Sequence, residues 1–100
     1  MTTATMTVTV RSIGPLKALF GRGLLDVDLP RGATVADLMR SLGQDYGEQA
    51  SRYFADEPGE AGFYRLRVMV NGRDIAVLGG RETVLSDGDE ILMLTPVAGG

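Results

Sequence analysis

One amphipathic helix pattern, with alternating strand patterns on both sides of it, most strongly constrains the fold of this chain. Thr34 is a suitable N-cap, and Asp37, three residues later, can reach back to the backbone of the cap. Apolar residues then recur at helical spacing, at Val35, Leu38, Met39 and Leu42. Gly43 stands where a left-handed C-cap is expected. The pattern predicts a helix over residues 34–43 with one apolar face.

Two alternating segments precede this helix. In residues 5–11 threonines alternate with apolar residues, so that one face carries Met6, Val8 and Val10. In the second segment aspartates alternate with apolar residues, and its apolar face carries Leu25, Val27 and Leu29. The two segments predict half-buried strands that pair as a hairpin, with a short connection punctuated by Gly14-Pro15 and by glycines at 21 and 23.

Less regular sequence follows the helix and leads into a third strand. Residues 48–54 predict one or two helical turns, anchored on the core by Tyr53 and Phe54, and residues 58–62 predict an exposed loop. The third strand carries Leu66, Val68 and Val70. Asn71-Gly72 closes it, and this dipeptide is the strongest short signal for a tight turn.

The remainder of the chain predicts a short strand and a final strand. Residues 74–78 predict a short strand or extended piece. Asp87-Gly88-Asp89 predicts a tight turn, which explains these acidic residues better than a calcium loop does, because such a loop needs further ligands. Residues 90–95 predict the last strand, in which Ile91 and Met93 face one way and Leu92 and Leu94 the other.

This order of elements predicts an α+β fold of the β-grasp type, a mixed sheet packed on one main helix. The last strand is apolar on both faces, so we expect it at the centre of the sheet. One face should meet the helix. The other is either covered by residues 44–62 or exposed as a partner-binding patch, and we favour the patch. We expect residues 1–100 to form a single domain with a flexible C-terminal tail over residues 96–100.

Composition excludes several classes of function. Ten basic and thirteen acidic residues give a net charge of −3, and the basic residues are scattered, so we expect no nucleic-acid partner. Neither a membrane-spanning apolar run nor a signal pattern is present, which predicts a cytoplasmic protein without a membrane partner. Cysteine and histidine are both absent, which excludes disulfides, thiolate or histidine metal sites and histidine-dependent nucleophiles. We therefore expect no metal site, and no catalysis by this chain alone.

The last five residues predict a reactive end. Pro96 lacks a backbone N–H and marks the end of regular structure. Gly99 and Gly100 have no Cβ, so their peptide units can lie in a narrow tunnel and deliver a carboxylate to another protein. The alternative is a frayed glycine terminus without a role, as in a plain β-grasp binding module.

Three ordered motifs resemble those of the ubiquitin-like sulfur carriers, and among them most closely the small subunit of molybdopterin synthase. They are the Val70-Asn71-Gly72 turn, the Leu85-Ser86-Asp87-Gly88-Asp89-Glu90 turn and the Pro96-Val97-Ala98-Gly99-Gly100 ending. The resemblance covers essentially the whole chain. Thiamine-pathway carriers are similar but usually shorter, and archaeal and tungsten-associated versions also resemble this chain.

The resemblance implies that Gly100 reacts and that Gly99 is its slim neighbour. A partner adenylating enzyme, similar to ubiquitin-activating enzymes, would use ATP to adenylate Gly100, and a sulfur donor protein would convert it to a thiocarboxylate. The tail would then enter the large subunit of molybdopterin synthase and donate sulfur to a pterin precursor of the molybdenum or tungsten cofactor. No cofactor would be bound permanently. Some relatives of this kind are protein modifiers, and others serve pathways such as thiamine synthesis, so those alternatives stay open.

Overall fold

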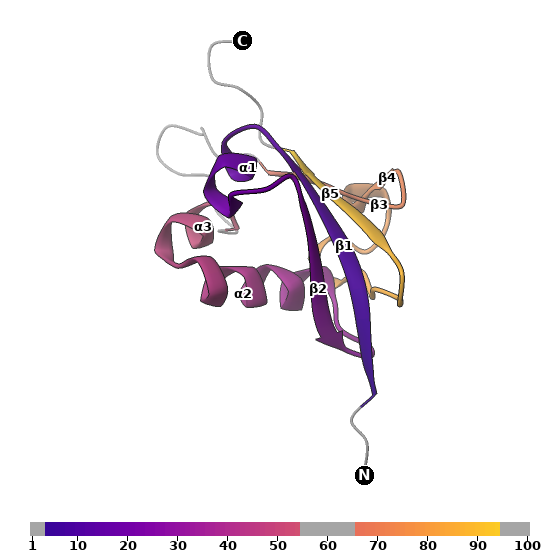
Figure 1. Cartoon of the computed structure of the whole chain (residues 1–100). Helices are drawn as coiled ribbons and strands as arrows, with labels where there is room; N and C mark the ends of the chain where they lie inside the picture. Colours follow the sequence, from indigo (N-terminus) through magenta and orange to yellow (C-terminus); the bar gives the residue numbers. More distant parts are fainter. Residues whose placement is uncertain (1–3, 55–65, 95–100) are drawn as a thin grey trace.

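The computed structural model describes residues 4–54 and 66–94 (Figure 1). Its strands form one five-stranded sheet in the order β2-β1-β5-β3-β4. In chain order the elements are β1 (Thr5–Ile13), α1 (Pro15–Phe20), β2 (Leu24–Pro30), α2 (Val35–Tyr46), α3 (Glu48–Tyr53), β3 (Arg67–Val70), β4 (Arg73–Asp74), the 3-10 turns η1 (Ile75–Val77) and η2 (Gly80–Glu82), and β5 (Glu90–Leu94).

The sheet is mixed, as predicted, and β5 lies at its centre. β1 pairs antiparallel with β2 and parallel with β5, and β3 pairs antiparallel with β5 and β4. The expected hairpin of the first two strands is therefore confirmed. The helices α1, α2 and α3 lie on one side of the sheet (Figure 1). The β-grasp prediction is confirmed, with α2 as the main helix and two shorter helices beside it.

The hydrophobic core lies between the sheet and α2. Every second residue of β1 and β5 faces inward, which is the period of two expected of a strand. The fully buried apolar side chains of β1, β5 and α2 are Val8, Val10, Ile91, Met93, Val35, Leu38 and Leu42. Within the described residues, no helix is long and apolar enough to cross a membrane.

The start of α2 follows the prediction. The hydroxyl of Thr34 accepts a hydrogen bond from the backbone N–H of Asp37 at 3.3 Å, and the Asp37 carboxylate accepts one from the Thr34 N–H at 2.9 Å. This reciprocal capping box satisfies two backbone donors that the helix itself leaves unpaired. The bonds from Thr34, and to a lesser extent the charge of Arg40, hold the pKa of Asp37 below its usual value.

The predicted end of this helix at Gly43 is wrong. The helix continues to Tyr46, and Gly47, with φ of 85°, is the residue that ends it. Gly43 has a different role, because a Cβ there would lie 2.8 Å from the hydroxyl of Ser51. A glycine inside the helix thus lets α3 pack closely against α2.

Two further segments differ from the prediction. The connection after β1 contains α1, which begins at Pro15 and buries Leu16 and Phe20. Residues 74–78 are mostly not extended, because Asp74 accepts a hydrogen bond from the Ala76 N–H at 2.9 Å and starts a 3-10 turn.

The predicted helical turns after residue 47 are confirmed by α3, with Phe54 buried. The predicted loop at residues 58–62 lies outside the described residues.

We expect Thr34→Ala to lower the free energy of unfolding by about 1 kcal/mol, because the Asp37 N–H loses its side-chain partner. Thr34→Ser keeps an oxygen at the same place and should retain most of the stability. Urea unfolding of both variants measures the difference. Equal loss in the two variants would contradict a role for the hydroxyl.

Candidate functional site

The sheet face opposite the helices carries an apolar patch at its centre. Register places Arg11 of β1 opposite both Leu24 and Leu92, Leu92 opposite Met69, and Leu94 opposite Ile13. Ile13 is 47% exposed and Leu24 50% exposed, while the other apolar members are half-buried. We call this group the outer-face patch, and its members are Ile13, Leu24, Met69, Leu92 and Leu94.

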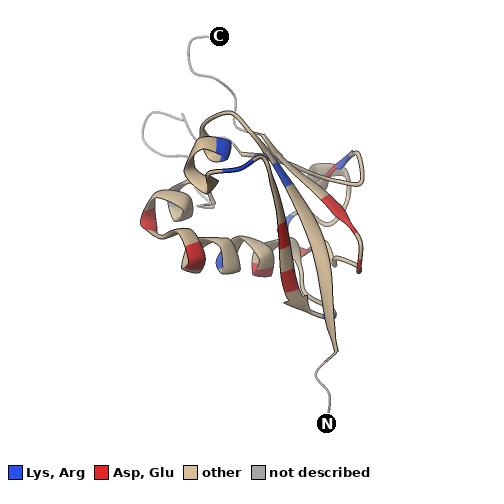
Figure 2. Ribbon diagram, in the orientation of Figure 1, with Lys and Arg blue, Asp and Glu red and all other residues tan. Residues whose placement is uncertain are grey.

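Two charged pairs lie on the same face as the outer-face patch, and Arg11 lies within the patch, between Leu24 and Leu92. Arg67 contacts Asp74 at 3.2 Å, and Arg11 lies 4.0 Å from Glu90. Figure 2 shows basic and acidic positions along the strands of the sheet. The pKa of Asp74 is lowered, first by the hydrogen bond from the Ala76 N–H and then by Arg67. Arginine is enriched at protein–protein interfaces, so exposed apolar side chains with an arginine among them suit such an interface.

The end of β5 belongs to this patch. Leu94 pairs with Ile13 on one side and with Arg67 on the other, so the strand is held on both edges up to its last described residue. Pro96 and the two predicted reactive residues, Gly99 and Gly100, follow within residues 95–100, which lie outside the described part of the chain.

The turns that precede β5 are fixed by the side chains that sequence motifs singled out. Asp87 accepts a hydrogen bond from the Thr7 N–H at 2.9 Å. Asp89 accepts bonds from the Ser86 N–H at 2.7 Å and from the amide of Asn71 at 2.9 Å. Both carboxylates therefore bind protein donors, and the predicted Asp-Gly-Asp turn is confirmed.

Asn71 holds β5 from the neighbouring turn. Its side-chain oxygen accepts a hydrogen bond from the Glu90 N–H at 2.9 Å, and its own N–H donates to the Glu90 carbonyl at 2.8 Å. Asn71 has φ of 51° and Gly72 has φ of 84°, the left-handed pair that a type I′ turn requires. The predicted Asn-Gly turn is confirmed, and it also positions the start of β5.

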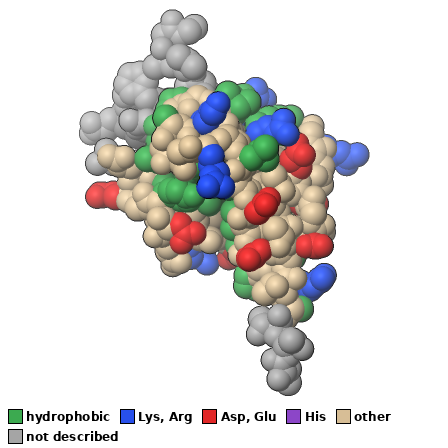
Figure 3. Space-filling model, viewed as in Figure 1, with side chains coloured by type: hydrophobic (Ala, Val, Ile, Leu, Met, Phe, Trp, Pro, Cys, Tyr) green, Lys and Arg blue, Asp and Glu red, His purple; other side chains and the backbone are tan. Residues whose placement is uncertain are grey.

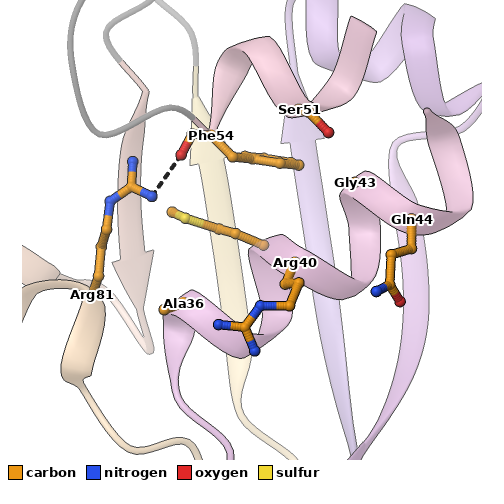
Figure 4. A pocket seen from close by; sticks show the side chains of 8 residues that line it. Ala36, Arg40, Gly43, Gln44, Ser51, Phe54 and Arg81 are labelled. Carbon is orange, nitrogen blue, oxygen red and sulfur yellow. Dashed lines mark hydrogen bonds between the residues drawn. The ribbon is translucent and has the colours of Figure 1, made fainter. Parts of the chain in front are cut away.

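A pocket of about 430 Å³ lies between α2, α3 and η2 (Figure 4). The Arg81 guanidinium, at one wall, donates to the carbonyl of Phe54 at 2.6 Å. The hydroxyl of Ser51 donates to the Gly47 carbonyl, and Arg40 bonds Asp37 at 3.1 Å. The described lining has no carboxylate, thiol or imidazole, so it offers no base to activate the serine. We therefore place the functional site at the outer face rather than in this pocket.

Sequence reasoning found only part of the outer-face patch. The opposite directions of Leu92 and Leu94 relative to Ile91 and Met93 were predicted and are confirmed. The described part of residues 44–62 packs on the helix side, where α3 contacts α2 and α1. Ile13 and Leu24 were missed. The signal for Ile13 was present, since it continues the alternation of β1 two residues beyond Arg11.

Comparisons with known proteins agree with this fold. The model of the ThiS family matches residues 13–100. Small archaeal modifier protein 3 of Haloferax volcanii is 43% identical over 68 residues, which cover 68% of this chain and 71% of the relative.

Solved structures give the same picture. The small archaeal modifier protein 1 of Methanosarcina acetivorans is 31% identical with a TM-score of 0.72, covering 97% of this chain and 99% of that one. A chain in the BexX/CysO complex of Amycolatopsis orientalis is 27% identical with a TM-score of 0.69, covering 93% and 99% respectively.

We expect Leu92→Arg and its neighbour variant Met93→Arg to separate the two faces of β5. Leu92 lies at the outer face, where the long arginine side chain can reach water, so the free energy of unfolding should fall by about 1 kcal/mol or less. Met93 is 0% exposed, so a charge there should cost more than about 4 kcal/mol or prevent folding. Denaturant unfolding measures both. Similar losses would show that the outer-face patch belongs to the core.

Proposed function

The chain belongs to the ThiS family of ubiquitin-like sulfur carriers and protein modifiers, and on that premise we propose that an enzyme activates the carboxylate of Gly100. In the first step, this carboxylate attacks the α-phosphorus of ATP and pyrophosphate leaves, so that Gly100 becomes an acyl-adenylate. The persulfide of a sulfur donor protein then displaces AMP and forms an acyl disulfide. A second thiol of the donor attacks the donor's own sulfur in this S–S bond, so that the thiocarboxylate of Gly100 is released and the donor is left with a disulfide. Gly99 has no side chain, so the tail is thin enough for the carbonyl carbon of Gly100 to reach an enzyme site through a narrow channel.

The observation that carries this proposal is the position of Leu94. The strand that leads to the two glycines is paired on both edges, and its last described residue is part of the outer-face patch. An enzyme that binds the patch would therefore hold the base of residues 95–100 at a defined place. The match to the family model, which extends to residue 100, supports the same reading of the glycines.

The chemistry explains why a second protein is needed. A carboxylate is a poor electrophile until one of its oxygens is converted into a good leaving group, and adenylation does this. The chain has no cysteine or histidine to serve as a nucleophile or proton carrier. The sulfur would be carried on the C-terminal carbonyl carbon, so this protein needs no thiol of its own.

For the destination of the sulfur, we propose molybdopterin synthesis. The thiocarboxylate would enter the active site of the synthase large subunit, and its sulfur would attack a pterin precursor to build the dithiolene that binds molybdenum or tungsten. The ordered Asn-Gly, Asp-Gly-Asp-Glu and Pro-Val-Ala-Gly-Gly motifs support this destination. The partners would be an adenylating enzyme, a sulfur donor protein and the large subunit.

A second candidate is conjugation to other proteins. It is supported by the 43% identity to small archaeal modifier protein 3. In this case a lysine amine of the target displaces AMP or an enzyme thiol from the activated glycine and forms an isopeptide bond. The activation step is common to both candidates, so the acceptor alone distinguishes them.

Intact-mass spectrometry tests the activation and sulfur transfer. After incubation with ATP, a persulfide donor and the cognate adenylating enzyme, we expect a mass gain equal to the exchange of one oxygen for one sulfur at Gly100. Adding the large subunit and the pterin precursor should remove the gain. Recovery of a Gly99-Gly100 remnant on target lysines, without oxygen-for-sulfur exchange, would instead identify a protein modifier. An unchanged mass with no conjugates would reject both candidates.

We expect Gly99→Val to abolish the mass gain while changing the free energy of unfolding by less than about 0.5 kcal/mol. The described core is built from residues 6–93, so the added side chain obstructs the enzyme rather than the fold. Ala98→Val adds similar bulk one residue farther from the carboxylate and should retain more activity. Parallel loss of stability and of sulfur transfer in Gly99→Val would count against a tail that acts only in the reaction.

A further inference from the structure

The two edges of the sheet differ in how much backbone they leave open. One edge is β4, which has only two residues and ends where Asp74 starts the 3-10 turn. The other edge is β2, which has seven residues and, within the described part of the chain, pairs with β1 alone. A long unpaired edge is a template for another strand. Among the described strands, β2 is therefore the one that can accept a partner.

Register shows which backbone groups of β2 face outward. The N–H of Ser12 donates to the carbonyl of Gly23 at 2.9 Å, so hydrogen-bonded positions fall at every second residue from there. On β2 these inward-bonded positions are Leu25, Val27 and Leu29. Asp26 and Asp28 lie between them, and their N–H and carbonyl groups point away from β1.

A groove runs along this edge, between β2 and α2. It consists of two cavities of about 270 Å³ and 430 Å³, which share Asp28 and Ser41 in their linings. Apolar side chains line the smaller cavity, and they are Leu25, Val27, Leu42 and Tyr46. Val27 is only half-buried, although it faces the core side. A side chain from an added strand would complete its burial.

The charge of this edge is acidic near the smaller cavity. Asp26 and Asp28 are exposed and are held by the hydroxyls of Thr9 at 3.2 Å and Thr7 at 2.7 Å. Asp45 of α2 lines the same cavity. Figure 3 shows acidic side chains beside apolar ones on this face of the molecule. Two copies joined at β2 would bring these aspartates together, so a second copy of this chain is a poor occupant.

The opposite end of the groove has a mixed charge. Arg31 and Arg40 line the larger cavity, and Arg40 bonds Asp37 at 3.1 Å. The groove is therefore acidic at the end near Asp26 and Asp45. A cationic segment would bind at that end.

We propose that β2 accepts an extended segment of a partner protein in which apolar residues alternate with lysine or arginine. The segment pairs with the outward N–H and carbonyl groups of Asp26 and Asp28. Its basic side chains lie opposite the two carboxylates on the outer side of the sheet, and its apolar side chains pack on Val27 within the groove. This interaction goes beyond the proposed function, because it uses neither Gly100 nor the activation reaction.

The test uses the isotope-labelled full chain and a synthetic heptapeptide of alternating lysine and valine. We expect saturable binding by NMR titration, with the amide hydrogens of Asp26 and Asp28 exchanging at least about tenfold more slowly in the complex. The same peptide with glutamate in place of lysine should bind much more weakly. Loss of the Gly99-Gly100 pair by deletion should leave peptide binding unchanged, which separates this result from any failure of the proposed function.

Two substitutions at one position separate the backbone from the charge. Asp28→Asn removes the charge and keeps the N–H, and should weaken binding about two- to fivefold. Asp28→Pro also removes the outward N–H but leaves the ladder to β1 intact, and should weaken binding by roughly tenfold or more. Unchanged amide signals of β1 would show that Asp28→Pro is folded. If Asp28→Pro does not fold, the hydrogen exchange of Asp26 and Asp28 in the unsubstituted chain with bound peptide tests the proposal instead. Absence of peptide binding, equal weakening by the two substitutions, or exchange protection at β4 instead of β2 would overturn the proposal.

Discussion

The pairing of β5 between β1 and β3 is the interaction on which both faces of the sheet depend. Its inward residues, Ile91 and Met93, are 0% exposed and pack on the helix side. Its outward residues, Leu92 and Leu94, form the middle of the outer-face patch. One short strand thus contributes to the core, to the surface proposed for recognition and to the attachment of the last residues. The turns around Asn71 and Asp87 fix where it begins.

Much of the fold could be predicted from the sequence, because its signals are local. A half-buried strand needs a period of two, and β1 and β2 show it directly. The capping box at Thr34 is likewise complete within four residues. Gly43 was misread because its role depends on Ser51, which belongs to another helix. A local rule for helix ends cannot include a contact between two helices.

The candidate site was predictable only in part, for a related reason. The two terminal glycines and the turn motifs are contiguous in sequence, so they could be recognised before any fold was known. The outer-face patch is not contiguous. Ile13 meets Leu94 only through the parallel register of β1 and β5, and Leu24 joins them through β2. The open edge of β2 is hidden in the same way, since no pattern within a strand tells which of its neighbours is missing.

The parallel pair of β1 and β5 also has a consequence for biosynthesis. The bond between the Thr7 N–H and the Asp87 carboxylate joins residues that are 80 positions apart. A nascent chain therefore cannot close its sheet until β5 has left the ribosomal exit tunnel, and until then β1 is paired with β2 alone and its edge toward β5 stays open. An open edge of this kind can pair with another chain, so the interval before β5 pairs with β1 is the stage at which this fold is most exposed to aggregation.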